Sequence, residues 1–295
     1  MSRARELFRL ARPSLAPTAA ADVIAAAAIF AAAPSIWRVA VAAVGSACLY
    51  AGGMIQNDLV DLKRDRTLHP DRPLVRDETL VTAARWLAIG LFALGLVLCG
   101  TAGALLPAIG VALLATLYNL VTKIRFPHDA ITLGAARACN LAVGLTVVGV
   151  ARDGAVTYLA AYFLFIGGIT IASRAEDQEP AQTRRLTLLL SFLPQFLGLG
   201  AFASLFMGER SVYLLLPLGA LLVGLFQAMV AGTRNSVIVY VRRSLLLIFL
   251  VHAVCVWAGE KTAWLPPIVL LAALSIYLMT VAGRAQAGES DMQGF

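Results

Sequence analysis

Three aspartates in an otherwise apolar stretch have the spacing of a metal site. Asp58, Asp61 and Asp65 follow an apolar run and come directly after Asn57. If the helix of that run continues through them, positions i, i+3 and i+7 place the three carboxylates on one face. Their mutual repulsion would be relieved by a bound cation. The stretch therefore predicts a Mg²⁺ site that also takes a phosphate group, because Mg²⁺ prefers oxygen ligands and often binds phosphates. The alternative is a solvated helix end with acids paired to nearby bases.

A second acidic segment lies farther along the chain. Glu176, Asp177 and Glu179 follow Arg174, and in a helix Glu176 and Glu179 would share a face. Pro180 makes a continuing helix unfavourable beyond this point. We interpret the segment as a second carboxylate cluster for a second Mg²⁺; a charged loop is the alternative.

Basic residues near the acids could bind phosphate oxygens. Arg72 and Lys123 are suited to this, Arg as a planar fork and Lys as a point charge. Tyr118 lies five residues before Lys123. The general excess of basic residues on one side of a membrane would also explain Lys123.

Three further polar residues lie within apolar runs. Arg137 and Asn140 share a helical face, and Asp22 stands among alanines. Charges within a membrane are costly and usually face a polar cavity, so we interpret all three as candidate substrate contacts. Snorkelling of Arg137 to the interface, or a buried structural pair for Asp22, are the alternatives.

These candidates must be positioned by membrane helices. The chain has 295 residues, of which 60% are hydrophobic and only 14% charged, and a mean hydropathy of +0.81. Soluble domains carry about 25% charged residues. Ten apolar runs approach the ~20 residues that cross a bilayer. They are 15–33, 38–56, 82–100, 103–120, 130–149, 156–172, 186–206, 211–230, 238–258 and 265–282. Arg242 and Arg243 interrupt the ninth run, which could begin only at Ser244.

The distribution of basic residues supports this count. With a cytoplasmic N-terminus, most of the 24 Lys and Arg residues fall on the cytoplasmic side. Only Arg38, Arg152, Arg210 and Lys261 fall on the opposite side, and Arg137 lies within a span. A cleaved signal peptide is the alternative for the first run. Without that run, however, the basic residues would no longer gather on one side of the membrane. The net charge of +7 thus reflects topology, and we expect no nucleic-acid partner. We predict an all-α, polytopic transmembrane helix bundle, formed by a single domain over 1–295.

The motif Asn57-Asp58-x-x-Asp61-x-x-x-Asp65 resembles the NDxxDxxxD signature of the UbiA superfamily of intramembrane aromatic prenyltransferases. The Arg-Pro segment that follows, the opening Arg12-Pro13 and the spacing to Tyr118 and Lys123 are also similar. The resemblance implies nine transmembrane helices around a cavity, so the run 265–282 would be a tenth. It also implies two aspartate-rich motifs that bind Mg²⁺ and the diphosphate of an isoprenyl donor.

The chain departs from the family pattern at the second motif. No pair of aspartates keeps the family's DxxxD or DxxxxD spacing there, since residue 181, four after Asp177, is Ala. The string Ser173-Arg174-Ala175-Glu176 resembles a bacterial branch of the family, the EboC-like proteins. This resemblance implies a bacterial inner membrane, and the distribution of basic residues places the predicted site of this multi-pass protein on the cytoplasmic side.

Together these observations predict a Mg²⁺-dependent prenyltransferase. It would transfer an isoprenyl group from an allylic prenyl diphosphate to a small aromatic or lipidic acceptor within the membrane. The identity of the acceptor is unknown, and membrane lipids are the expected surroundings. The predicted catalytic residues are Asn57, Asp58, Asp61 and Asp65. The predicted substrate contacts are Asp22, Arg72, Tyr118, Lys123, Arg137, Asn140 and Arg174. The predicted metal ligands are Asp58, Asp61, Asp65, Glu176, Asp177 and Glu179. A membrane terpene cyclase and a non-catalytic isoprenoid-lipid-binding protein are the alternatives.

Overall fold

The computed structural model describes residues 3–31, 34–70, 72–149, 153–206 and 209–292. These residues form helices joined by short connections and no strands. The helices up to η1 are α1 (Arg3–Leu10), α2 (Ala16–Phe30), α3 (Ile36–Leu68), α4 (Pro73–Arg76), α5 (Leu80–Thr101), α6 (Leu105–Leu117) and the π-helical turn η1 (Tyr118–Thr122). Those that follow are α7 (His128–Val147), α8 (Ala155–Arg174), η2 (Ala175–Asp177), α9 (Ala181–Leu205), η3 (Glu209–Leu214), α10 (Leu215–Ala231), α11 (Arg234–Ala258), η4 (Thr262–Trp264) and α12 (Leu265–Met292).

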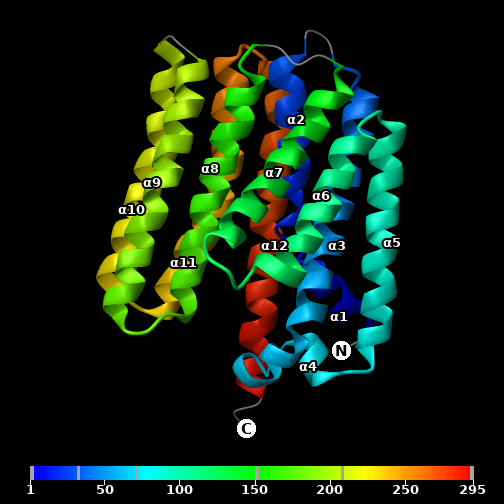
Figure 1. Cartoon of the computed structure of the whole chain (residues 1–295), viewed down its shortest axis with the longest axis vertical. Coiled ribbons are helices and arrows are strands. Elements are labelled where there is room, and N and C mark those ends of the chain that lie inside the picture. The colour runs from blue at the N-terminus through cyan, green and yellow to red at the C-terminus, as the bar shows by residue number, and fades with distance from the viewer. Residues whose placement is uncertain (1–2, 32–33, 71, 150–152, 207–208, 293–295) are drawn as a thin grey trace.

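Among the described residues, nine helices are long and apolar enough to span a membrane, and α2 is a shorter apolar helix of 15 residues. Each of the ten expected runs corresponds to one of these helices. The first is shorter than expected, because α2 ends at Phe30; residues 32 and 33 of that run lie outside the described part of the chain. The chain is therefore a multi-pass, all-α bundle (Figure 1).

The helix of the ninth run starts earlier than its arginines suggest. It does not begin at Ser244, since α11 begins at Arg234. The Thr233 side chain caps this end by accepting a hydrogen bond from the backbone N–H of Ser236. Arg243 stays in the helix by donating to Gln227 of α10. Its charge is thus held near the end of the bundle rather than interrupting the span.

The helix α2 lies in the middle of the bundle, between helices from both halves of the chain (Figure 1). It contacts α3, α7, α11 and α12. Small side chains make this possible: most of α2 is alanine, and a Cβ on Gly144 of α7 would come within 2.3 Å of the Val23 carbonyl oxygen. Asp22 is therefore carried into the most enclosed part of the molecule.

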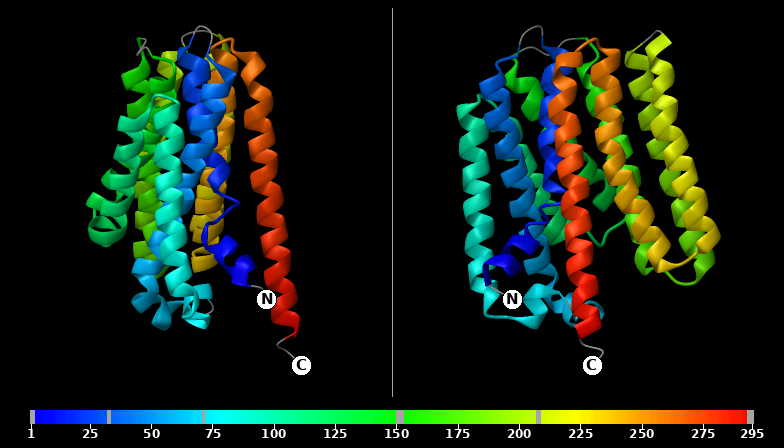
Figure 2. Two further views of the ribbon diagram at one scale, coloured as in Figure 1. Left: turned by 90° about the vertical axis from the view of Figure 1, so that its right-hand side faces the viewer. Right: turned by 180° about the vertical axis from the view of Figure 1, so that it is seen from behind.

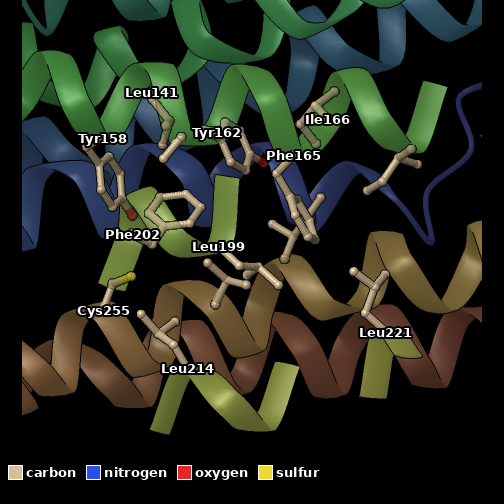
Figure 3. Packing of buried hydrophobic residues seen from close by; sticks show 14 of the residues in the cluster. Leu141, Tyr158, Tyr162, Phe165, Ile166, Leu199, Phe202, Leu214, Leu221 and Cys255 are labelled. Atoms are coloured by element: carbon tan, nitrogen blue, oxygen red, sulfur yellow. The ribbon is translucent and has the colours of Figure 1, made fainter. Parts of the chain in front are cut away.

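A large apolar cluster packs α8 against α9 and α11. Figure 3 shows Tyr158, Tyr162 and Phe165 of α8 facing Leu199 and Phe202 of α9. The close approach depends on Gly168, whose added Cβ would lie 2.6 Å from the Ser191 carbonyl oxygen. Ala26 and Phe30 of α2 belong to the same cluster, and the hydroxyl of Tyr162 reaches Asp22 of α2.

The polar residues gather toward one end of the bundle. The short helices α1 and α4 lie there, beside the last turns of α3 (Figure 1). At the edge of the bundle stands α12, which contacts α2 and α11 and leaves much of its apolar surface exposed (Figure 2). The end that carries α1 and α4 is the place where the predicted site residues meet.

Candidate active site at one end of the bundle

The aspartate motif forms one helical face, as the spacing predicts. The helix α3 continues through the motif to Leu68, so Asp58, Asp61 and Asp65 lie on successive turns. Asp58 and Asp65 are buried and Asp61 is half-buried. The Asn57 amide lies 3.4 Å from Asp58 Oδ1 and 3.3 Å from Asp61 Oδ2. Asn57 thus links the first two carboxylates.

Each of these carboxylates is paired with a basic side chain from another segment. Arg12 lies 3.2 Å from Asp58. Arg72 lies 3.4 Å from Asp58 and 2.5 Å from Asp65. Lys123 contacts Asp61 and donates a 2.7 Å hydrogen bond to Asn57 Oδ1. Three cations and three carboxylates therefore face one another at the end of α3.

Local structure brings each base to this place. Arg12 follows α1 in a left-handed conformation (φ 46°), which is uncommon outside glycine and aims its side chain at α3. Arg72 precedes Pro73, the first residue of α4, where proline favours helix initiation. Lys123 follows η1, which Asn119 ties to α3 through a 3.0 Å hydrogen bond to the Gly53 carbonyl oxygen.

The environment affects the two bases differently. Burial lowers the pKa of the Lys123 ammonium, although its contact with Asp61 opposes the shift. Burial also disfavours the charge of Arg12, but Asp58 and other nearby groups outweigh it and raise the pKa of the guanidinium. Arg12 thus stays a fixed positive charge beside the first aspartate.

The donor set suits a hard divalent cation. Carboxylate oxygens and the Asn57 amide oxygen are ligands that Mg²⁺ accepts. Among the described residues, no three His, Cys, Asp or Glu side chains form a ready-made metal cage. The carboxylates are held by bases instead. An incoming metal would therefore need to bring an anion that takes over those bases.

A pocket lies directly beyond the motif, toward the bundle interior. It lies between α2, α3, α6, η1 and α7, and its cavity volume is about 60 Å³. Its lining residues are Ala19, Ser46, Leu49, Tyr50, Gly53, Met54, Val111, Ala115, Tyr118, Asn119, Leu133, Ala136, Arg137 and Asn140. The walls are mostly apolar, with a few polar side chains that include Arg137 and Asn140. An apolar lining with a few polar groups is typical of a small-ligand site.

Behind Arg137 and Asn140, Asp22 is the centre of a buried hydrogen-bond network. Its carboxylate accepts hydrogen bonds from Tyr162 (2.5 Å) and Asn140 (2.9 Å) and lies 2.9 Å from His252 Nε2. It also forms a 3.2 Å ion pair with Arg137. Four helices, α2, α7, α8 and α11, contribute to this network. The sequence prediction placed Asp22, Arg137 and Asn140 among substrate contacts; of these, Arg137 and Asn140 line the pocket and Asp22 lies behind them.

The second acidic segment differs from the expected helical cluster. The expectation that Glu176 and Glu179 share a helix face is wrong, because α8 ends at Arg174 and only η2 follows. Each acid has its own basic partner. Asp177 lies 2.7 Å from Arg64 of α3, Glu176 lies 2.9 Å from Arg234 of α11, and Glu179 lies 2.8 Å from Arg184. Arg174 pairs with buried Asp129 at 2.6 Å.

Sequence reasoning missed two members of these clusters. Arg12 was noticed only as part of an Arg-Pro pair, although it contacts Asp58. His252 is not among the residues that the sequence singles out, yet it lies against Asp22 from 230 positions away. A histidine in an apolar span is itself a signal, but only the fold shows its partner.

One comparison decides the family. The family model described as "UbiA prenyltransferase family" matches residues 14–236, which include the aspartate motif, the pocket and the second acidic segment. The chain belongs to the UbiA prenyltransferase family. It is therefore a membrane prenyltransferase, and its family residues extend from just before α2 to the start of α11. The EboC-like branch stays a prediction. No curated protein sequence is significantly similar to this UbiA-family chain.

Solved structures have the same fold at low sequence identity. A solved structure of digeranylgeranylglyceryl phosphate synthase aligns with a TM-score of 0.61 and 17% identity, covering 90% of this chain and 100% of that one. A UbiA homologue from Archaeoglobus fulgidus, bound to GPP and Mg²⁺, aligns with a TM-score of 0.61 and 16% identity, covering 88% of this chain and 99% of that one. The apo UbiA homologue from Aeropyrum pernix K1 aligns with a TM-score of 0.60 and 18% identity, covering 84% of this chain and 96% of that one.

Proposed function

We propose that the protein transfers an isoprenyl group from an allylic prenyl diphosphate to a small aromatic or lipidic acceptor, in a Mg²⁺-dependent reaction within the membrane. The observation that carries this proposal is the opposition of Asp58, Asp61 and Asp65 to Arg12, Arg72 and Lys123. Carboxylates can hold a divalent cation while the bases hold diphosphate oxygens. In the absence of both ligands the two sets neutralise each other.

The residues fit a bound Mg²⁺ at the motif. Asp58, Asp61 and Asp65 would hold it, with Asn57 orienting the first two carboxylates. When bound, Mg²⁺ supplies a positive charge that stabilises the leaving diphosphate. The Archaeoglobus fulgidus homologue has been solved with GPP and Mg²⁺, with DMAPP and Mg²⁺, and with Cd²⁺, which supports a divalent metal here as well.

The basic side chains of the site would stabilise the negative charge that develops on the leaving diphosphate. The carbon–oxygen bond of the donor breaks, its electron pair leaves with the diphosphate, and the acceptor bonds to the same carbon and loses a proton. Arg12 and Arg72 would bind diphosphate oxygens, Arg72 as a planar fork. Lys123 would add a point charge, and the low dielectric of its buried position would strengthen its attraction to the diphosphate.

The apolar pocket would exclude water from the reacting carbon. Its lining includes the apolar side chains of Leu49, Met54, Val111 and Leu133, which carry no nucleophilic group and disfavour bound water. Tyr50 and Tyr118 place aromatic rings in the same lining. Because the pocket adjoins the motif, a donor with its diphosphate at Asp58 could extend its tail or meet its acceptor there.

We also propose that the whole chain acts as one domain of a bacterial inner membrane, with the motif on the cytoplasmic side. The basic residues of α1, α4 and the segment after η1 support this orientation by the positive-inside rule. The tenth apolar helix, α12, packs on α2 and would belong to the same unit. The second acidic segment is proposed as a weaker metal site, because its acids form separate ion pairs with Arg64, Arg234 and Arg184 and do not share one helical face.

The experiment measures diphosphate release by the protein in lipid nanodiscs, with allylic diphosphates of increasing length and with or without Mg²⁺. We expect Mg²⁺-dependent release that Asp61→Asn abolishes. Glu78→Gln is the matched control, since Glu78 is exposed and forms an ion pair with exposed Arg66. Release that is equal without Mg²⁺, or unchanged in Asp61→Asn, would contradict the proposal.

Product analysis of the same samples separates the alternatives. A cyclic hydrocarbon formed without any acceptor would indicate a terpene cyclase. Donor binding without release, even with an acceptor panel, would indicate a non-catalytic lipid-binding protein. A prenylated acceptor would establish the transferase reaction.

A further inference from the structure

We propose that the groove between α10 and α11 binds the phosphate of an anionic membrane phospholipid, with Arg243 as its charged contact. The cavity volume of the groove is about 240 Å³, which exceeds that of the pocket beyond the motif, about 60 Å³. Its lining residues are Gly224, Gln227, Ala228, Ala231, Ser236, Val239, Tyr240 and Arg243. These residues lie apart from the candidate active site, so the inference does not rest on the proposed function.

The groove lies on the outside of the molecule. The helices α10 and α11 pack side by side at the edge of the bundle opposite α5 (Figure 1). Among the lining residues, Gly224, Ala228 and Tyr240 are buried and form the floor, whereas Ala231 and Arg243 are exposed at the rim. In a membrane, a groove at this outer surface is open to lipid molecules.

Arg243 gives the groove a positive charge that no acid balances. Its Nη1 donates a 2.6 Å hydrogen bond to Gln227 Oε1, which positions the guanidinium without neutralising it. The acids of the second acidic segment pair with other arginines, and no carboxylate in the described part of the chain forms an ion pair with Arg243. Arginine stays protonated in proteins, so the charge is permanent. The exposed guanidinium and the Gln227 amide N–H groups can both donate to an anion.

The guanidinium lies at the depth expected for lipid phosphates. The contact with Gln227 places it about 6 Å before the end of α10 at Ala231. The backbone of Arg243 lies deeper, about 14 Å along α11 from Arg234. The side chain therefore leans toward the connection between the two helices, as a snorkelling arginine does. Because α11 is about 37 Å long and the hydrocarbon is about 30 Å thick, this end of the pair reaches the headgroup layer.

The charge of the groove favours an anionic phospholipid over a zwitterionic one. A phosphate can neutralise the guanidinium through charge-assisted hydrogen bonds. The ammonium group of a choline or ethanolamine headgroup would find no carboxylate among the lining residues and would lie beside a like charge. Basic pockets between membrane helices are typical sites for anionic headgroups. Exposed apolar side chains of α10, such as Phe226 and Val230, can contact the acyl chains.

The test compares dioctanoyl phosphatidylglycerol with dioctanoyl phosphatidylcholine, which have the same acyl chains and differ in net charge. Their dissociation constants are measured by microscale thermophoresis on the full-length protein in a neutral detergent. Mg²⁺ and inorganic diphosphate are present throughout, so that the bases of the motif are occupied. We expect phosphatidylglycerol to bind about fivefold more tightly. Equal binding of the two lipids, or tighter binding of phosphatidylcholine, would overturn the proposal.

Two matched variants assign the preference to the groove. Arg243→Gln removes the charge and should bring the two dissociation constants to within about twofold of each other. Arg85→Gln is the control, because Arg85 is an exposed arginine near the same end of the bundle, on α5, and this variant should keep the preference. A preference that persists in Arg243→Gln, shown to be folded by circular dichroism, would overturn the proposal, as would an equal loss in Arg85→Gln.

A soluble phosphate distinguishes a lipid site from a general anion site. The probe is sn-glycerol 3-phosphate, which has the phosphate but no acyl chains. We expect no binding of it at concentrations that saturate the protein with phosphatidylglycerol, because the acyl chains contribute apolar contact with α10. Comparable binding of the two compounds that Arg243→Gln abolishes would overturn the lipid assignment and identify a site for soluble phosphates.

Discussion

Arg72 donates a 2.5 Å hydrogen bond to Asp65, the last aspartate of the motif, after the chain has turned back on itself at the end of α3. Together with Arg12 and Lys123, this contact closes the motif in the absence of ligands. A metal ion that enters alone must displace bases from the carboxylates, and an anion that enters alone must displace carboxylates from the bases. Binding of the metal therefore frees the bases for the anion, and binding of the anion frees the carboxylates for the metal.

We predict from this pairing that Mg²⁺ and diphosphate bind cooperatively. Either ligand alone should raise the melting temperature little. Both together should stabilise the protein by about 2.7 kcal/mol when present at a hundred times their joint dissociation constant. The measurement is thermal unfolding in detergent with Mg²⁺, inorganic diphosphate or both. A full shift with Mg²⁺ alone would show that the carboxylates form an independent metal site.

The second acidic segment should matter less for catalysis than the first. Asp177 is half exposed and binds Arg64 and Arg234, so it acts as a link between α3 and α11. We expect Asp177→Asn to retain diphosphate release within a few fold, whereas Asp61→Asn loses about a hundredfold or more. Equal losses in the two variants would instead assign a metal to the second segment.

The buried network should be unequally sensitive to the loss of its two tyrosine hydroxyls. The Tyr162 hydroxyl bonds two charged groups, Asp22 and Arg137, whereas the Tyr158 hydroxyl bonds only His252. Tyr162→Phe should lower the free energy of unfolding by about 3 kcal/mol and Tyr158→Phe by about 1 kcal/mol. Unfolding by increasing SDS in mixed micelles measures both. The reverse order would contradict the central role of Asp22.

Close packing of α8 on α9 gives a further prediction. In Gly168→Ala the new Cβ would lie 2.4 Å from Gln195 and 2.6 Å from the Ser191 carbonyl oxygen. We expect a loss of about 1–3 kcal/mol of stability, because the two helices must separate. Gly200→Ala is the control, since nothing lies within 4 Å of its added Cβ. An undiminished unfolding free energy in Gly168→Ala would contradict this close approach.

Much of this architecture follows from local sequence patterns. The spans are long apolar runs, and the membrane requires such runs to be helical because backbone groups must be satisfied internally. The aspartate face follows from helical periodicity, since nothing in α3 ends the helix before Leu68. These features depend on neighbours in sequence, and the pattern therefore predicts them well.

The rest depends on contacts between distant segments. Pro180 was read as the end of a helix, but α8 already ends at Arg174, where side-chain pairs with Asp129 and Arg234 take over. The pairing of Arg137 with Asp22 and Tyr162 depends on three helices that are distant in sequence, so the sequence alone could not predict it. The role of Arg12 likewise appears only when its turn is placed beside Asp58.

The contact between Asp22 and His252 has a consequence for how the protein is made. The two residues are separated by 230 positions, and α2 is synthesised before α7, α8 and α11. When α2 leaves the ribosome its carboxylate has none of its partners, since Arg137, Tyr162 and His252 are synthesised later. A 15-residue segment with an unpaired acid inserts poorly by itself. Stable integration of α2 therefore depends on the later arrival of α7, α8 and α11.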